Sequence, residues 1–385
     1  MELFIFYNVL QHSTIQALLA GENVHTMREL ITFSETEGIT DLPLTELIVS
    51  LLANDENILS GLVQANRKVG KDLYEFALKD LRKIFTLFEK GAEFVYHNSK
   101  NASSFAQGYC TSIHNMTNAK TPEELLELLI AHYRLLGVGV FAKYIAFGFD
   151  GRVHGIAQID REIVLDSLIG LVHQKKVLVE NTEALLAGKQ ANNVLLFGDR
   201  GTGKSSCVKA LLNLYASRGL RVIEVQKQQI HALAQLFSQL AAKPNQYIIF
   251  LDDLSFEKQD ADYKALKTLM DGQLQAMPKN VVIYATSNRK HLVKESWSDR
   301  QPDDVHANDN MQETLSLAER FGISLVFSLP NQKEYLQIVG ELLARNGIEM
   351  TAEIEKQAMV WQMNYGSKSP RCATQFVYAY CQNRT

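Results

Sequence analysis

The sequence predicts an α/β fold: a parallel sheet with helices on both faces, followed by a small helical lid and preceded by a mainly helical N-terminal domain. Beyond residue 160, short apolar runs alternate with helical segments, which is typical of a parallel sheet that is buried on both faces. A glycine-rich segment, Gly198–Ser205, joins one such run to a helix. After Pro330 the apolar residues return to helical spacing.

Length and composition are those of an ordinary globular protein. The chain has 385 residues, 46% hydrophobic and 21% charged, with a net charge of −4, so no global attraction to nucleic acid or to an anionic membrane is expected. The four cysteines are scattered, which predicts reduced thiols in a cytoplasmic protein. The apolar N-terminus lacks a basic region, and no run approaches the roughly 18 apolar residues of a membrane span, so no membrane partner is expected.

Residues 1–137 are expected to form the helical N-terminal domain. Apolar residues recur at helical spacing in Leu44–Leu52 and in Leu73–Phe88. A third helix is predicted to begin at Thr121 and to end at Gly137. Thr121 can cap it, Pro122 suits its first turn, and Glu124 would complete a capping box.

The rest of the chain divides into three parts. Residues 138–159 are expected to form a hairpin or connector, because the dipeptide Asp150-Gly151 favours a tight turn. Residues 160–329 are expected to form the α/β domain, with strands in the runs VLLF, YIIFL and VVIYATS. Residues 330–385 are expected to form the lid, with helices over Lys333–Arg345, Ala352–Tyr365 and Arg371–Asn383.

The segment after VLLF carries the strongest chemical signal. It matches the pattern GxxxxGK[ST] in full, between an apolar strand and the predicted helix Ser206–Ala216. Glycines let successive N–H groups turn towards phosphates, and the helix N-terminus adds its positive end. Lys204 is expected to reach the β- and γ-phosphates of ATP, and the Ser205 hydroxyl to bind Mg²⁺. The predicted binding residues here are Gly198, Asp199, Arg200, Gly201, Thr202, Gly203, Lys204, Ser205 and Ser206.

A second element follows YIIFL, where the chain continues with Asp252 and Asp253. Carboxylates at the carboxyl end of a parallel strand lie beside the crevice where ligands bind. Asp252 is therefore expected to hold Mg²⁺, and Asp253 to orient or deprotonate the attacking water.

The wider pattern resembles the AAA+ ATPases. Asp166–Gly170 is similar to the segment that opens an AAA+ module, which implies that Ile169 and Gly170 lie near the adenine. The resemblance makes Asn288, after the third strand run, the sensor-1 residue and Arg320, in LAERFG, the arginine finger. It makes Arg371, which opens the last lid helix, the sensor-2 arginine.

A closer resemblance rests on the strings ANNVLLFGDRGTGKSS, FLDDLSFE, IYATSNRKHL and LSLAERFG. They look like a bacterial family of predicted AAA+ ATP-binding proteins described as a domain of unknown function. The resemblance covers roughly Ile156 to the C-terminus, and more loosely the helical N-terminal part. It implies the AAA+ P-loop NTPase fold with an ATP site.

Two departures from the wider pattern are informative. AAA+ motors usually end the acidic strand in Asp-Glu, so Asp252-Asp253 implies slow, switch-like turnover; Glu257 is the alternative base. The stretch Val222–Gln246 has no glycine and hence no pore loop, and Phe237 has the helical spacing of a core residue. Threading of a polypeptide is therefore not expected.

Three functions remain open at this point. The leading hypothesis is a slow ATPase whose cycle drives an oligomerisation or partner-binding switch, with a homo-oligomer when ATP is bound, because an arginine finger such as Arg320 acts across a subunit interface. The second is a nucleic-acid-associated loader that resembles replication initiators, which share the paired aspartates. The third is a small-molecule kinase, against which the Asn288, Arg320 and lid features argue.

Overall fold

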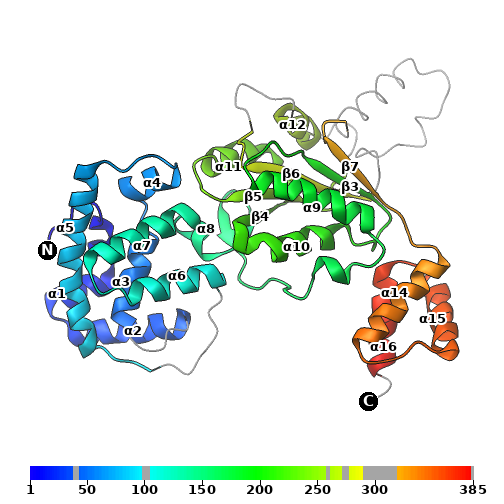
Figure 1. Cartoon of the computed structure of the whole chain (residues 1–385), viewed down its shortest axis with the longest axis horizontal. Coiled ribbons are helices and arrows are strands. Elements are labelled where there is room, and N and C mark those ends of the chain that lie inside the picture. Colours follow the sequence, from blue (N-terminus) through cyan, green and yellow to red (C-terminus); the bar gives the residue numbers. More distant parts are fainter. Residues whose placement is uncertain (38–42, 98–104, 257–260, 271–276, 289–318, 383–385) are drawn as a thin grey trace.

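The computed structural model describes residues 1–37, 43–97, 105–256, 261–270, 277–288 and 319–382 (Figure 1). Its N-terminal part is built from helices. These are η1 (Tyr7–Gln11), α1 (Ser13–Ala20), α2 (Asn23–Glu37), α3 (Pro43–Ala53), α4 (Ile58–Gln64), α5 (Lys71–Glu89), η2 (Lys90–Glu93), α6 (Gln107–Thr117), α7 (Pro122–Leu135) and α8 (Val140–Lys143).

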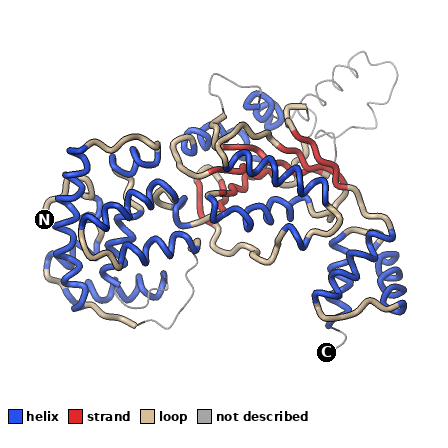
Figure 2. The backbone as a smooth tube through the Cα atoms, in the orientation of Figure 1, coloured by secondary structure: helices blue, strands red, loops and turns tan. Residues whose placement is uncertain are grey.

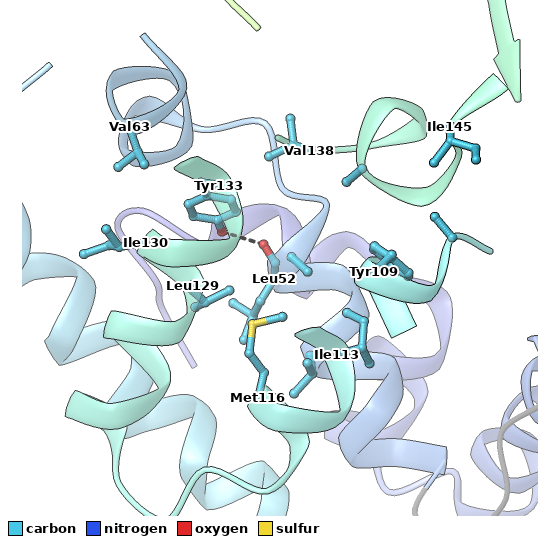
Figure 3. Close-up of a cluster of buried hydrophobic side chains, with 14 of the residues drawn as sticks. Leu52, Val63, Tyr109, Ile113, Met116, Leu129, Ile130, Tyr133, Val138 and Ile145 are labelled. Atoms are coloured by element: carbon cyan, nitrogen blue, oxygen red, sulfur yellow. Dashed lines mark hydrogen bonds between the residues drawn. The ribbon is translucent and has the colours of Figure 1, made fainter. Parts of the chain in front are cut away.

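The apolar faces of these helices meet in a buried core. Figure 3 shows the side chains of α3, α6 and α7 turned towards one another, with the Tyr133 hydroxyl donating a hydrogen bond of 2.6 Å to the Leu52 carbonyl. Tyr133 is fully buried, so this bond satisfies its hydroxyl away from water. The two apolar runs expected to form helices correspond to α3 and α5.

Helix α7 begins as its sequence predicts, with one difference. The Thr121 side chain accepts a hydrogen bond from the Glu124 N–H at 3.1 Å, and Pro122 occupies the first turn. The expected capping box is not formed in full, because the Glu124 carboxylate accepts from the N–H of Lys120, at 2.7 Å, instead of that of Thr121. The carboxylate therefore ties down the residue before the cap.

A seven-stranded sheet forms the centre of the molecule, in the order β2-β1-β4-β5-β6-β3-β7. All neighbouring pairs are parallel except β1 with β2. The strands are β1 (Ala146–Phe149), β2 (Val153–Gly155), β3 (Val194–Gly198), β4 (Leu220–Val225), β5 (Gln246–Leu251), β6 (Val281–Ser287) and β7 (Ile323–Phe327). The three predicted runs are β3, β5 and β6, and the turn at Asp150-Gly151 closes the β1–β2 hairpin.

Helices cover both faces of the sheet, which gives three layers (Figures 1 and 2). On one face, α9 (Val172–Leu186) and α10 (Lys204–Tyr215) pack on side chains of every second strand position. On the other face lie η5 (Lys227–Ala232), α11 (Leu233–Leu240) and α12 (Ala261–Met270). Phe237 is buried in this second layer, as its spacing predicts.

The chain ends in a three-helix lid with a hydrophobic core of its own. Its helices are α14 (Gln332–Arg345), α15 (Ala352–Tyr365) and α16 (Pro370–Gln382). Asn331 and Glu334 form a reciprocal capping box at the start of α14, and Thr351 caps α15. The lid lies at the opposite end of the molecule from the N-terminal helices (Figure 1).

All four cysteines are free. Over the part of the chain that the structure describes, no helix combines the length and the apolar character needed to cross a membrane.

Candidate nucleotide-binding site

The glycine-rich loop lies between the end of β3 and the start of α10. Gly198 has φ +132°, and a Cβ there would lie 2.2 Å from the Phe327 carbonyl oxygen of β7, so only glycine fits between these strands. Gly203, with φ +95°, directly precedes α10. The loop thus turns the first N–H groups of α10 towards the edge where the parallel strands end.

A cavity of about 410 Å³ opens in front of this loop. It lies at the carboxyl ends of β3, β5 and β6, which is where a parallel α/β sheet binds ligands. Its lining combines loop, strand and lid residues, namely Arg200, Gly201, Thr202, Gly203, Lys204, Ser205, Ser206, Asp252, Asp253, Thr286, Asn288 and Arg371. Most of the residues predicted for phosphate and metal binding are therefore brought together.

Lys204 is buried, and its ammonium group lies inside the loop. Its Nζ donates to the carbonyl oxygens of Gly198 at 2.9 Å and Asp199 at 2.6 Å, and to Oδ1 of Asn288 at 3.3 Å. Burial lowers the pKa of Lys204, while the carboxylates of Asp199, Asp253 and Asp252 oppose this shift. A cation held at the mouth of a helix N-terminus suits an anionic phosphate.

Ser205 and Asp252 are neighbours in the wall of the cavity. The Ser205 hydroxyl donates to Oδ1 of Asp252 at 2.7 Å. Mg²⁺ prefers oxygen ligands, and a hydroxyl beside a carboxylate at the end of a phosphate loop supplies them. These two residues and the loop glycines therefore fit a Mg²⁺–nucleotide complex.

Asp253 has a backbone conformation that is rare outside glycine. Its φ is +50°, in the left-handed region, and Asn288 Nδ2 donates to its Oδ1 at 2.6 Å. Strained backbone of this kind occurs at functional sites where surrounding bonds hold it in place. The two residues predicted as base and sensor 1 are thus in direct contact.

Thr286 also belongs to this group, although the sequence assigned it no role. Its hydroxyl donates to Oδ1 of Asp252 at 2.5 Å and accepts from the N–H of Asp253 at 2.9 Å. Threonine is common in β-strands, so its presence in an apolar run predicts no function. Only the pairing of β6 with β5, the strand that precedes the two aspartates, brings Thr286 into the site.

A second cavity, of about 300 Å³, adjoins the first. It is enclosed by the segment before α9, the phosphate loop and the lid, and Ile169, Gly201, Ile338, Arg371 and Tyr378 contribute to its wall. Gly170, with φ +80°, follows Ile169 in the chain. Ile169 therefore lies in the cavity wall, whereas Gly170 is not among the lining residues, and the place of both beside an adenine stays a prediction.

Side chains from two elements fix the segment before α9. Lys175 Nζ donates to the carbonyl oxygens of Leu165 at 3.1 Å and Leu168 at 2.9 Å. From the lid, Arg345 donates to the Asp166 carbonyl at 2.9 Å.

Arg371 lines both cavities, and its contact with a nucleotide stays a prediction. Its backbone N–H donates to the Gly201 carbonyl at 3.4 Å. Asp199 makes a second link in this direction, because its Oδ2 accepts from the N–H of Leu329, in the segment between β7 and the lid. The phosphate loop is thus bonded to the lid and to its linker.

Arg320 lies elsewhere. It is half-buried in the turn before β7, at the amino end of that strand. The phosphate loop adjoins the carboxyl end, where Phe327 pairs with Gly198. A five-residue strand at about 3.3 Å per residue puts roughly 16 Å between its amino and carboxyl ends. Glu257, and Leu317 and Ala318 of the Arg320 motif, lie outside the described residues.

The site thus places a buried lysine, a serine hydroxyl and two carboxylates in and around one cavity at the carboxyl ends of parallel strands. The parallel order β4-β5-β6-β3-β7, with the phosphate loop after β3 and a helical lid, is the AAA+ P-loop arrangement that the sequence resemblance predicts.

Comparison with protein families gives a match over more than half of the chain. Residues 142–384 match the family model described as "Protein of unknown function (DUF815)", so the match begins ahead of Ile156. Among curated proteins, none matches this sequence.

Several solved structures are partly similar. A variant of RuvB of Thermotoga maritima is 18% identical with a TM-score of 0.39, covering 57% of this chain and 64% of its own. Orc1 of Aeropyrum pernix, solved in complex with DNA, is 17% identical with a TM-score of 0.41, covering 58% and 64%. The FIGL-1 AAA domain in complex with ADP is 20% identical with a TM-score of 0.35, covering 52% and 68%. The chain spans less than two thirds of the length of the RuvB and Orc1 chains.

Proposed function

The chain belongs to the DUF815 family, and for this member we propose a slow, Mg²⁺-dependent ATPase whose nucleotide cycle drives an oligomerisation or partner-binding switch. The observation that carries the proposal is the meeting of two bonded pairs, Ser205 with Asp252 and Asp253 with Asn288, in one cavity beside Lys204. One pair suits a metal and the other suits a water molecule.

The proposed roles follow from this geometry. A bound nucleotide would supply the phosphoanhydride bond that is broken, and its metal would neutralise negative charge on the phosphate oxygens. Lys204 would bind the phosphates, and Ser205 and Asp252 would hold the metal. Asp253 would take a proton from the attacking water with Oδ2, the carboxylate oxygen that does not accept the bond from Asn288. Asn288 would orient the same water.

Slow turnover is proposed because of the side-chain length of Asp253. Aspartate is one methylene shorter than the glutamate of AAA+ motors, and the bond from Asn288 holds its carboxylate close to the strand ends. A base further from its water transfers protons less effectively, because general-base catalysis needs hydrogen-bond contact. This suits a switch better than a motor.

An oligomer is proposed because of where Arg320 lies. Arg320 lies at the amino end of β7, whereas the phosphate loop of its own chain lies at the carboxyl ends of the strands. If Arg320 stabilises charge on a transferring phosphate, it does so in the site of a neighbouring copy. Residues 1–137 are the proposed partner-binding domain. The segment 138–159 was expected to be a separate hairpin or connector, but its β1–β2 hairpin extends the sheet of the α/β domain 160–329 through the parallel pairing of β1 with β4. The lid follows as 330–385.

One experiment tests these points together: mass by light scattering with ATP, with ADP and without nucleotide, and phosphate release measured in the same samples with and without DNA. We expect a larger mass with ATP than with ADP, and slow phosphate release that requires Mg²⁺. Lys204→Ala is the control and should show neither effect.

Unchanged mass in all three states, together with no phosphate release, would reject the proposal. Strong stimulation of phosphate release by DNA would favour the loader hypothesis instead. Loss of that stimulation with rising salt would show that the protein contacts the phosphates of the DNA backbone.

A further inference from the structure

We propose that Thr286 is a positioning residue of this site, whose hydroxyl sets both the Asp252 carboxylate and the backbone of Asp253. The inference builds on the proposed function where it concerns hydrolysis. Its effect on Mg²⁺-dependent nucleotide binding can be measured whether or not the protein hydrolyses ATP.

The Thr286 hydroxyl is buried and bonded on both its donor and its acceptor side. Only 2% of the residue is exposed, at the end of β6 next to β5. The hydroxyl has one proton, which it donates to Oδ1 of Asp252, and it accepts from the N–H of Asp253. One side chain therefore contacts the proposed metal ligand and the proposed base at the same time.

The oxygen that receives this bond is the one that faces the phosphate loop. Oδ1 of Asp252 also accepts from the Ser205 hydroxyl at 2.7 Å. The bond from Thr286 restricts rotation of the carboxylate about its Cβ–Cγ bond, because that rotation would break it. The carboxylate is thereby held towards Ser205. Outer partners of this kind orient metal ligands in other proteins.

Thr286 also supports the strained turn at Asp253. Its hydroxyl accepts from the Asp253 N–H at 2.9 Å, and its backbone carbonyl accepts from the Leu254 N–H at 2.7 Å. Two consecutive N–H groups are thus bonded to one residue on either side of the φ +50° conformation. Left-handed backbone is uncommon outside glycine, although aspartate adopts it more readily than most residues, and these two bonds hold it at Asp253.

Thr286→Val tests the idea because valine has nearly the same shape and lacks the hydroxyl. It leaves the bond to Leu254 intact and removes the bonds to Asp252 and Asp253. Thr286→Ser restores the hydroxyl. The matched control is Thr182→Val, the same change at a fully buried threonine of α9 whose hydroxyl bonds to the Leu178 carbonyl and the Tyr284 hydroxyl.

The measurements are the affinity for a fluorescent ATP analogue, with Mg²⁺ and with EDTA, and the rate of ATP hydrolysis. For Thr286→Val we expect affinity in EDTA within about twofold of wild type, because the loop and Lys204 are unchanged. The gain in affinity on adding Mg²⁺ and the kcat should each fall about 10- to 100-fold, as for outer partners of metal ligands. Thr286→Ser should recover both to within a few fold.

A Thr286→Val protein with the wild-type Mg²⁺ dependence and kcat would overturn the inference, as would an equal effect in Thr182→Val. If wild type does not hydrolyse ATP but Thr286→Val still loses Mg²⁺-dependent affinity, the ATPase proposal fails and the positioning role stands. Thr286→Ala replaces the valine variant if the latter does not fold, with the same expectations.

Discussion

At the scale of single residues, His132 has a charge state that is set by burial. Its side chain lies in the N-terminal core, 2% exposed, and its Nδ1 is 2.8 Å from the Ser112 hydroxyl. Burial lowers the pKa of His132 to about 4. The imidazole is therefore neutral in the folded protein at neutral pH.

This predicts a loss of stability in mild acid. Because the folded-state pKa lies below the unfolded value of about 6.5, the unfolded chain takes up the proton first as the pH falls. Stability should decrease from about pH 6.5 down to about pH 4, by up to roughly 3 kcal/mol from this residue. Urea unfolding across this range measures it.

The comparison variant is His132→Gln, which should flatten the pH dependence whatever its stability at neutral pH. His114→Gln, at an exposed position of α6, should leave the wild-type slope. Parallel curves for wild type and His132→Gln would contradict the prediction.

Some residues of the site can be predicted from the sequence pattern, and others can be identified only from their contacts in the structure. Lys204, Ser205 and the two aspartates follow from residue type and spacing around predicted strands. Thr286 does not, because a threonine in a strand has the same appearance whether its hydroxyl bonds to a neighbour's carboxylate or to water. Its role depends on which strand lies next to β6, and no local pattern contains that order.

At the scale of elements, the close contact between β3 and β7 depends on Gly198. Gly198→Ala should weaken this junction, because the new Cβ would approach the Phe327 carbonyl and φ +132° is unfavourable for alanine. We expect a loss of about 2 kcal/mol or more in the free energy of unfolding and a loss of nucleotide affinity.

Gly21→Ala separates conformation from contact. Gly21 has φ +79°, and a Cβ added there would have no atom within 4 Å, so only backbone strain of about 1 kcal/mol is expected and nucleotide affinity should be unchanged. Equal effects of the two substitutions would show that the contact with β7 is unimportant.

The strands illustrate how far the sequence predicts the elements. β3, β5 and β6 are continuous apolar runs and are predicted directly, whereas β4 and β7 are not among those runs. In β4, Arg221 interrupts the apolar pattern but is buried, with its guanidinium donating to the Ala216 and Leu220 carbonyls. In β7, at the sheet edge, buried positions alternate with exposed ones, so the strand is not a continuous apolar run.

At the scale of the whole molecule, the position of Arg320 predicts catalysis between copies. Arg320→Ala should keep its affinity for ATP and lose about 10²- to 10³-fold in hydrolysis. Asp253→Asn should also be inactive. A mixture of the two should recover part of the activity, because an Arg320→Ala subunit has an intact Asp253 and its Asp253→Asn neighbour has an intact Arg320.

Turnover of the mixture against each variant alone, at equal total protein, is the measurement. If Arg320 acted within its own chain, no subunit in the mixture would hold a complete site and no activity would return. Wild-type turnover in Arg320→Ala alone would reject any catalytic role for this arginine.

The apolar core does not stop at the end of the N-terminal helices. A single buried cluster runs from these helices through Val138, Ala142 and Ile145 to the α9–α10 face of the sheet. The lid has a separate core; residues 328–331 connect it to β7, and single hydrogen bonds tie it to Gly201 and Asp166. The two ends of the molecule are therefore attached in different ways.

This difference has a mechanical consequence. The N-terminal helices and the sheet share packed side chains, and such cores resist gradual deformation, so the two should rotate as one rigid lever about the nucleotide. A small rotation at the phosphate loop would then become a large displacement at the N-terminal tip, which lies far from that loop (Figure 1).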